Sequence, residues 1–225
     1  VPAPGGHSVP LWCGFLPLLK ARRMIIPTRL KKIAQIADSN SMARHGMLNN
    51  VHIRKRNNNT ELTASDGKKL LRFVVPCNEA SHDHIDDCEL QVHSQQFKQA
   101  IGAPGTISHH VDEQPNGVIR FKQVLKGGMG STVDIPTASD HHYPDADTVL
   151  EKPVHHQNGE DLHEYEKHYV SAKLLRDLLD AVISAGGDYV DLTTSTAGCP
   201  VYIDGKTDDK KGSFRFHGIL MPATK

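Results

Sequence analysis

The sequence predicts an α+β fold in which a short helix followed by about three strands occurs three times. Three segments carry apolar residues at helical spacing, and each precedes segments in which apolar and polar residues alternate. Turn-forming pairs such as Asp66-Gly67 and Asn116-Gly117 separate the alternating segments and indicate antiparallel hairpins. The repeat is one of structure, about 60 residues long, and no repeated sequence accompanies it.

Each predicted helix has its own start signal. The first spans about 28–40, where Thr28 can cap the first turn and a basic cluster follows it. The second spans 94–101, with Ser94 as its cap and Gly102 at its end. The third spans 171–184 and has the strongest apolar stripe; Ser171 caps it, and two glycines at 186–187 end it.

The strands are expected in three groups, one after each helix. Alternation, β-branched residues and the turn signals between them set their limits. The expected strands span 47–54, 61–64 and 69–75, then 106–111, 118–124 and 131–135, and finally 189–194, 201–204 and 214–221.

The grouping of these elements predicts the domain organisation. The first two units share residues 24–150, and the third stands alone at 165–225. A polar, histidine-rich segment at 151–164 is expected to be a linker. Residues 1–23 lack a helical or strand period and are expected to be a disordered extension, with a docking arm as the alternative.

Composition limits the function. Lysine plus arginine equals aspartate plus glutamate at 26 each, which argues against tight, salt-driven DNA binding by one isolated chain. The four cysteines are widely spaced without a Cys-x-x-Cys pair, which favours free thiols in a reducing cytoplasm. No apolar run approaches the ~20 residues that span a bilayer, and basic residues follow the apolar segment near the start, opposite to a signal peptide. A cytoplasmic protein without a membrane segment is therefore expected.

Three short motifs carry a resemblance to a known family. Residues 63–70 read Thr-Ala-Ser-Asp-Gly-Lys-Lys-Leu, residues 142–145 read His-Tyr-Pro-Asp with Val149 after them, and residues 218–222 read Gly-Ile-Leu-Met-Pro. In order and spacing they resemble the bacterial sliding clamp, the beta subunit of the replicative DNA polymerase. The resemblance implies a DNA-clamp-like fold with helices on one face and antiparallel sheets on the other.

The resemblance covers about 24–225 and describes a shortened relative. The first two units are similar to the middle domain of a clamp, and the third is similar to the second half of its last domain. A first domain and half of the last domain have no counterpart here, which puts closure of a ring around DNA in doubt. The lone third unit would leave a sheet edge uncovered, so homo-oligomers are expected in which two third units complete one domain by two-fold pairing.

The resemblance also implies a cleft that receives short peptides of partner proteins. An apolar pocket of this kind suits aliphatic or aromatic peptide anchors. Lys68 and Lys69 replace a histidine and an arginine of the family and are expected at the rim, where a lysine cannot reproduce a planar guanidinium contact. The matching positions are Ser65, Gly67, Lys68, Lys69, Leu70, Pro144, Val149, Ile219, Met221 and Pro222.

A DNA-facing surface is implied in the same way. Basic residues on or beside the three helices would contact phosphates of duplex DNA without reading bases, with an ordinary solvated surface as the alternative. These residues are Arg29, Lys31, Lys32, Lys98, Lys173 and Arg176.

The predicted function is a non-catalytic processivity or scaffold factor in DNA replication or repair, without cofactor or metal. A clamp-derived peptide adaptor that does not encircle DNA is the second hypothesis, and a metal-binding protein built on the 15 histidines is the third. His109-His110 and similar pairs lack zinc-site spacing, and neighbours on a strand point to opposite faces. No catalytic motif occurs; Cys88 beside His84 and Asp87 is expected in a polar loop without an orienting scaffold.

Overall fold

The computed structural model describes residues 24–37, 46–77, 88–138, 143–150, 169–194, 199–207 and 213–223. The predicted extension at 1–23 and the predicted linker at 151–164 lie outside these residues. The elements of the first unit are β1 (Met24–Pro27), η1 (Thr28–Gln35), η2 (Gly46–Asn49), β2 (Asn50–Arg56), β3 (Asn59–Ser65) and β4 (Lys69–Pro76). The second unit has β5 (Cys88–His93), α1 (Ser94–Ile101), β6 (Thr106–Gln114), β7 (Val118–Leu125) and β8 (Gly128–Pro136). The rest are α2 (Ala146–Leu150), α3 (Ala172–Ala185), β9 (Asp191–Thr193), β10 (Val201–Thr207) and β11 (Phe214–Leu220).

Two antiparallel sheets form one layer of the molecule. The first has the order β1-β6-β7-β8, and the second has the order β5-β2-β3-β4-β11-β10-β9. The strand before each of the first two helices pairs with the other unit, since β1 joins β6 and β5 joins β2. The first two units therefore interlock.

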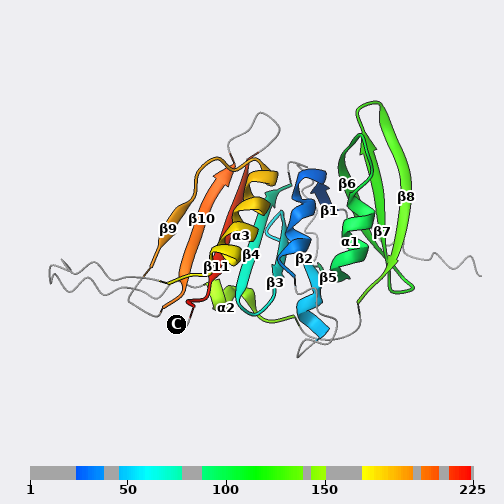
Figure 1. Cartoon of the computed structure of the whole chain (residues 1–225). Helices are drawn as coiled ribbons and strands as arrows, with labels where there is room; N and C mark the ends of the chain where they lie inside the picture. Colours follow the sequence, from blue (N-terminus) through cyan, green and yellow to red (C-terminus); the bar gives the residue numbers. More distant parts are fainter. Residues whose placement is uncertain are drawn as a thin grey trace, which may run out of the picture.

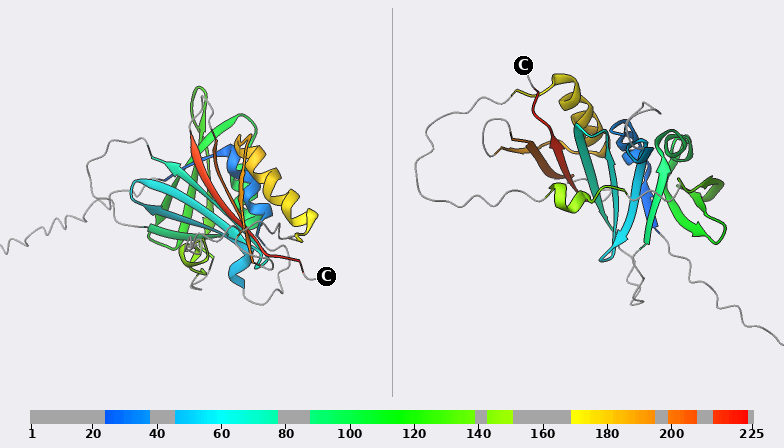
Figure 2. Two further views of the ribbon diagram at one scale, coloured as in Figure 1. Left: turned by 90° about the vertical axis from the view of Figure 1, so that its left-hand side faces the viewer. Right: turned by 90° about the horizontal axis from the view of Figure 1, so that it is seen from below.

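The helices confirm the predicted layering. The helices η1, α1 and α3 lie side by side on one face, with η1 in contact with both others (Figure 1). The short helix α2 lies on the opposite face of the seven-stranded sheet (Figure 2). The α+β fold with helices on one side is thus confirmed, and α2 is an addition that the sequence did not indicate.

The third unit shares a sheet and a core with the first. Strand β11 pairs with β4, and this register brings Phe216 opposite Phe73, their ring centroids 6.3 Å apart in an edge-to-face arrangement. Both rings are fully buried in a core that also contains residues of η1, α1 and α3. The division into 24–150 and 165–225 remains a prediction.

The helix ends show which capping expectations hold. In α3 the Ser171 hydroxyl accepts a hydrogen bond from the Leu174 amide, and Gly186 ends the helix with a left-handed φ of 94°. In α1 the bounds are as expected, but His93 Nδ1 is the capping acceptor in place of Ser94. The first helix is a 3₁₀ helix that ends at Gln35, and Thr28 does not cap it because Thr28 is already its first residue.

Two of the hairpin turns differ in their backbone conformation. The Asn57-Asn58 pair joins β2 to β3 with both φ values positive, as a tight hairpin turn requires. Only Gly67 is left-handed in the Asp66-Gly67 turn, and Ser65 pairs with Leu70, so four residues form that loop. The expectation that Cys88 lies in a polar loop is wrong: it begins β5 and is buried.

Candidate functional site

The turn between β3 and β4 is held by its own side chains. The Asp66 carboxylate accepts hydrogen bonds from the amides of Lys68 and Lys69, both at 2.9 Å. The Ser65 hydroxyl donates to the Lys69 carbonyl at 2.9 Å and accepts from the Gly67 amide at 3.1 Å. With Gly67 at a φ of 83°, these bonds fix the loop in one conformation.

The strand register brings the two distant peptide-site motifs together. Ser65 pairs with Leu70 across β3 and β4, and Leu70 pairs with Ile219 across β4 and β11. Cross-strand partners share a face of the sheet, so these three side chains form one row. Beyond the ladder, the Met221 amide donates to the Lys68 carbonyl at 2.9 Å, which extends the junction into the turn.

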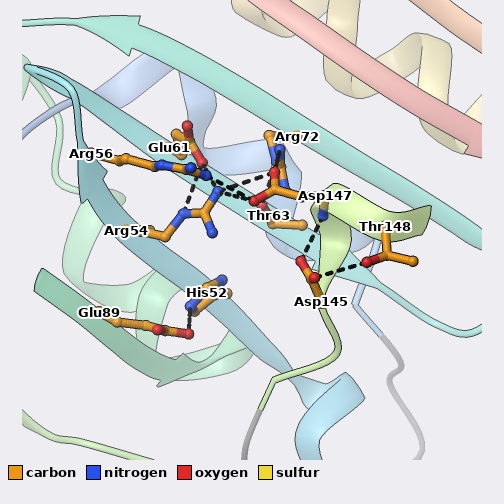
Figure 3. A network of polar contacts seen from close by, with 10 residues as sticks. All are labelled: His52, Arg54, Arg56, Glu61, Thr63, Arg72, Glu89, Asp145, Asp147 and Thr148. Carbon is orange, nitrogen blue, oxygen red and sulfur yellow. Dashed lines mark hydrogen bonds and ion pairs between the residues drawn. The ribbon is translucent and has the colours of Figure 1, made fainter. Parts of the chain in front are cut away.

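Helix α2 is anchored over this face by one carboxylate. Asp147 forms ion pairs with Arg72 at 2.5 Å, Arg54 at 2.9 Å and Arg56 at 3.0 Å (Figure 3). Arg54 also pairs with Glu61 at 2.7 Å. Partial burial by itself would raise the pKa of Asp147, but the hydrogen bonds from Arg72 and Arg54 outweigh it and lower that pKa to about 2.

The start of α2 is fixed by a second carboxylate. Asp145 accepts hydrogen bonds from the Thr148 hydroxyl at 2.8 Å and from the Asp147 amide at 2.9 Å (Figure 3). The hydrogen bond from Thr148 lowers the pKa of Asp145. These contacts place α2 beside the face of β4 and β11 that carries Leu70 and Ile219, because Arg72 stands two residues from Leu70 on β4.

A stacked pair holds the chain just before α2. The Tyr143 ring lies on the His52 ring with centroids 4.7 Å apart and planes 14° from parallel. His52 Nε2 lies 2.6 Å from the Glu89 carboxylate. Burial lowers the pKa of His52, although Glu89 acts in the opposite direction. Together with Asp147, this stack ties the 143–150 segment to β2, β4 and β5.

The predicted peptide-site residues include both buried and exposed side chains. Leu70 and Ile219 are 6% and 3% exposed, whereas Val149 and Met221 are 45% and 44% exposed. Pro144, Gly67 and Lys68 are exposed, and Pro222 is half-buried. Val149 and Met221 are thus accessible apolar side chains of the predicted set, while Leu70 and Ile219 are closed off from solvent.

The expectation that Lys69 lies at the rim is wrong. Its side chain is 5% exposed, and its ammonium lies 2.6 Å from the Asp177 carboxylate of α3 and 3.6 Å from Asp66. As a neighbour of Leu70 on β4, it points to the helix face of the sheet. Lys69 therefore joins the turn to α3, and Lys68 is the lysine left at the surface.

A groove of about 1070 Å³ opens on the helix side of the same turn. Its walls come from the turn, the C-terminal segment, the end of η1 and the starts of α1 and α3. Two of the predicted DNA-facing lysines, Lys98 and Lys173, line it together with Lys68 and Met221. Lys68, Lys98, Lys173 and two helix N-termini give this groove donors suited to anions, while the Asp66 and Asp177 carboxylates that also line it pair with Lys69.

The other predicted DNA-facing residues have different surroundings. The Arg29 guanidinium lies over the Phe214 ring, 4.1 Å from its centroid. Lys31 lies against the end of α1, where a Cβ added to Gly102 would be 2.5 Å from Lys31 Nζ. Lys32 is half-buried on η1, and Arg176 is exposed on α3. The structure thus brings Lys98 and Lys173 to one groove but not the whole predicted set.

The histidine-based hypothesis finds no metal-binding cluster among the residues that the structure describes. His109 is fully buried against the Phe121 ring, while His110 is half-buried on the other face of β6. Burial lowers the pKa of His109 to about 4. The pairs at 141–142 and 155–156 lie outside the described residues. Within the same residues, no helix is long and apolar enough to cross a membrane.

Comparison with known proteins identifies the fold. No protein-family model matches the sequence, and no curated protein matches it either. Among solved structures, the Helicobacter pylori beta clamp bound to a DNA ligase peptide is 14% identical with a TM-score of 0.64; the match covers 93% of this chain and 68% of that chain. The Pseudomonas aeruginosa DNA polymerase sliding clamp is 13% identical with a TM-score of 0.60, covering 100% and 70% of the two chains. The Streptococcus pneumoniae DNA polymerase III beta chain is 15% identical with a TM-score of 0.59, covering 100% and 67%.

Proposed function

We propose that this chain, which has the sliding-clamp fold, is a non-catalytic docking protein of DNA replication or repair. The observation that supports this most is the register of β3, β4 and β11, which aligns Ser65, Leu70 and Ile219 in one row beneath α2. A beta clamp of the same fold has been solved with a DNA ligase peptide. The row, the exposed Val149 and the exposed Met221 form the peptide-binding cleft of the proposal.

The chemistry of this cleft suits a short peptide with aliphatic or aromatic anchors. Val149 and Met221 supply apolar contacts, and the methionine thioether adapts to different anchors. Pro144, Gly67 and Pro222 add little side-chain entropy cost on binding, and Lys68 supplies one positive charge at the edge. A peptide with an acidic residue beside its apolar anchors is therefore the expected ligand.

Fluorescence anisotropy with a labelled DNA ligase peptide tests the docking. Wild type is expected to bind, and Met221→Asp is expected to weaken binding by about tenfold or more, because a charge replaces an apolar contact. Met129→Asp is the matched control, since Met129 on β8 is 47% exposed and lies outside the cleft. Equal affinity of the wild type and Met221→Asp would overturn the assignment of the cleft.

Contact with duplex DNA is the second part of the proposal. The groove that contains Lys98 and Lys173 offers ammonium groups to phosphates, and a sequence-independent contact of this kind permits sliding. The other four residues, Arg29, Lys31, Lys32 and Arg176, stand on η1 and α3 in the same helix layer.

Retention on DNA separates the processivity factor from an adaptor that does not encircle DNA. A protein that encircles DNA stays on closed circular DNA and leaves linear DNA through its ends. Loss from both templates, with intact peptide binding, would favour the adaptor. Lys98→Glu together with Lys173→Glu is expected to reduce association with either DNA and to lower its salt dependence.

A further inference from the structure

Among the residues that the structure describes, η1 is the one helix of this layer that packs against α3, and the outer side of α3 carries no further helix. Helix η1 contacts α1 on one side and α3 on the other, so the helix layer ends at α3 (Figure 1). One side of α3 is tied to the first unit, because the Ser184 hydroxyl donates to the Arg29 carbonyl at 3.3 Å and Asp177 pairs with Lys69. The opposite side faces away from the molecule.

That opposite side is apolar. Leu175, Leu179 and Ile183 are spaced by four residues and therefore lie along one side of the helix. Ile183 is 66% exposed, while Leu175 and Leu179 are half-buried. An exposed isoleucine at the end of such a row is costly in water and is typical of a helix interface.

The sheet beneath continues the apolar surface. Leu192 on β9 pairs with Ile203 on β10, so both point to the face that α3 covers. Ile203 is buried, but Leu192 is 57% exposed and the nearby Tyr189 is 87% exposed. Strand β9 is the last strand of the seven-stranded sheet. The helix layer and the sheet therefore end on the same side of the molecule, and both α3 and β9 carry apolar side chains there.

We propose that this surface binds a second copy of this chain, with the two α3 helices antiparallel on a two-fold axis at Leu179. The spacing of the row suits this arrangement, because Leu175 and Ile183 stand at equal distances from Leu179. Leu175 of each copy then packs against Ile183 of the other, and Leu192 is covered. The pair of helices repeats between two copies the contact that η1 and α1 make within one copy.

Charge complementarity supports a second copy over an unrelated partner. Arg176 and Asp180 are one turn apart on α3, and neither forms an ion pair with another described residue. Antiparallel pairing at Leu179 puts Arg176 about 3 Å along the axis from Asp180 of the second copy, at a rise of about 1.5 Å per residue. Two equivalent ion pairs thus form across the two-fold axis. This association is independent of the peptide cleft.

Sedimentation equilibrium of the full chain tests the proposal at micromolar concentration. The expected species has about twice the mass of the 24.8 kDa chain. Ile183→Asp is expected to raise the dimer dissociation constant at least about tenfold. Met129→Asp, on the edge strand β8 of the other sheet, is expected to leave it unchanged. A monomeric wild type, or dissociation by Met129→Asp in place of Ile183→Asp, would overturn the proposal.

A charge exchange tests the register of the two helices. Arg176→Glu is expected to weaken the dimer by about threefold to tenfold, because it places four acidic groups around the axis. Arg176→Glu combined with Asp180→Arg restores opposite charges and is expected to recover most of the affinity. Circular dichroism checks that each variant is folded. A double variant that is no stronger than Arg176→Glu would rule out this two-fold arrangement.

Discussion

At the scale of single residues, Asp147 has the clearest structural role in the candidate site. It stands among three arginines from β2 and β4, and two carboxylates, its own and that of Glu61, partly balance them. The arginine contacts keep the carboxylate ionised, which is why its pKa falls to about 2. Its removal leaves the half-buried Arg54 and the buried Arg72 with fewer partners, which is costlier than losing a surface ion pair.

Asp147→Asn is expected to destabilise the protein by about 1–3 kcal/mol at pH 7 and to weaken peptide binding, since α2 no longer holds Val149 in place. Thermal unfolding and anisotropy measure the two effects. Asp134→Asn is the control, because the Arg120–Asp134 ion pair is exposed and lies on the other sheet. Because the pKa of Asp147 is depressed, its contribution persists above about pH 4 and is lost as pH falls through 2. A variant as stable as Asp134→Asn would refute the anchoring role.

His109 gives a stability dependence in a different pH range. Its pKa is about 4 in the folded state and about 6.5 in an unfolded chain, so protons bind the unfolded state first as the pH falls. The free energy of unfolding is therefore expected to decrease by up to about 3 kcal/mol between pH 7 and pH 4. Denaturant titrations at several pH values give the free energy of unfolding as a function of pH. This free energy is expected to depend less steeply on pH in His109→Leu than in the wild type, and as steeply as in the wild type in His110→Gln. An unchanged pH dependence in His109→Leu would contradict the buried, neutral imidazole.

At the scale of elements, the sequence predicted what local periodicity controls. Helix α1 has the expected bounds, and α3 has the expected cap and ends within one residue of its limits, because apolar spacing and end signals agree there. Nearly all the strands after each helix were expected for the same reason. The sequence did not predict strand β5, because only half of its residues are buried and a polar segment precedes it. It did not predict helix α2, because only one of the five side chains of this helix is buried.

In the candidate site too, some contacts could be predicted from the sequence and others could not. The resemblance paired the turn with the C-terminal strand, and the register of β4 and β11 brings Leu70 and Ile219 together. The roles of Asp147 and of Lys69 depend on contacts with residues more than 70 positions away in sequence. Periodicity contains no information on such contacts, so neither the anchor of α2 nor the inward position of Lys69 could be predicted.

A close contact between β10 and β11 allows a test of how the third unit is packed. A Cβ added to Gly205 would lie 2.3 Å from the Phe216 ring, which is fully buried. Gly205→Ala is expected to destabilise the protein by about 1–3 kcal/mol, because the ring cannot shift freely in the core. Gly127→Ala, with open space around the new methyl group, is the matched control in thermal unfolding. Equal melting temperatures for the two variants would contradict this packing.

At the scale of the whole molecule, the two faces suit different partners. The helix layer contains the groove with Lys98 and Lys173, and the opposite face of the seven-stranded sheet holds the row beneath α2. The β3–β4 turn lies between them, because Lys68 and Met221 line the groove and are joined by a backbone hydrogen bond next to the paired Leu70 and Ile219. The proposed second copy lies at the end of the helix layer and leaves both surfaces accessible.

Hydrogen–deuterium exchange of the full chain with and without the DNA ligase peptide tests the peptide cleft most directly. Slower exchange is expected in α2 and at the β4–β11 junction when the peptide is bound, with no change at α1. Protection limited to the helix-side groove, at the starts of α1 and α3, would contradict the cleft, as would the absence of any protection at saturating peptide.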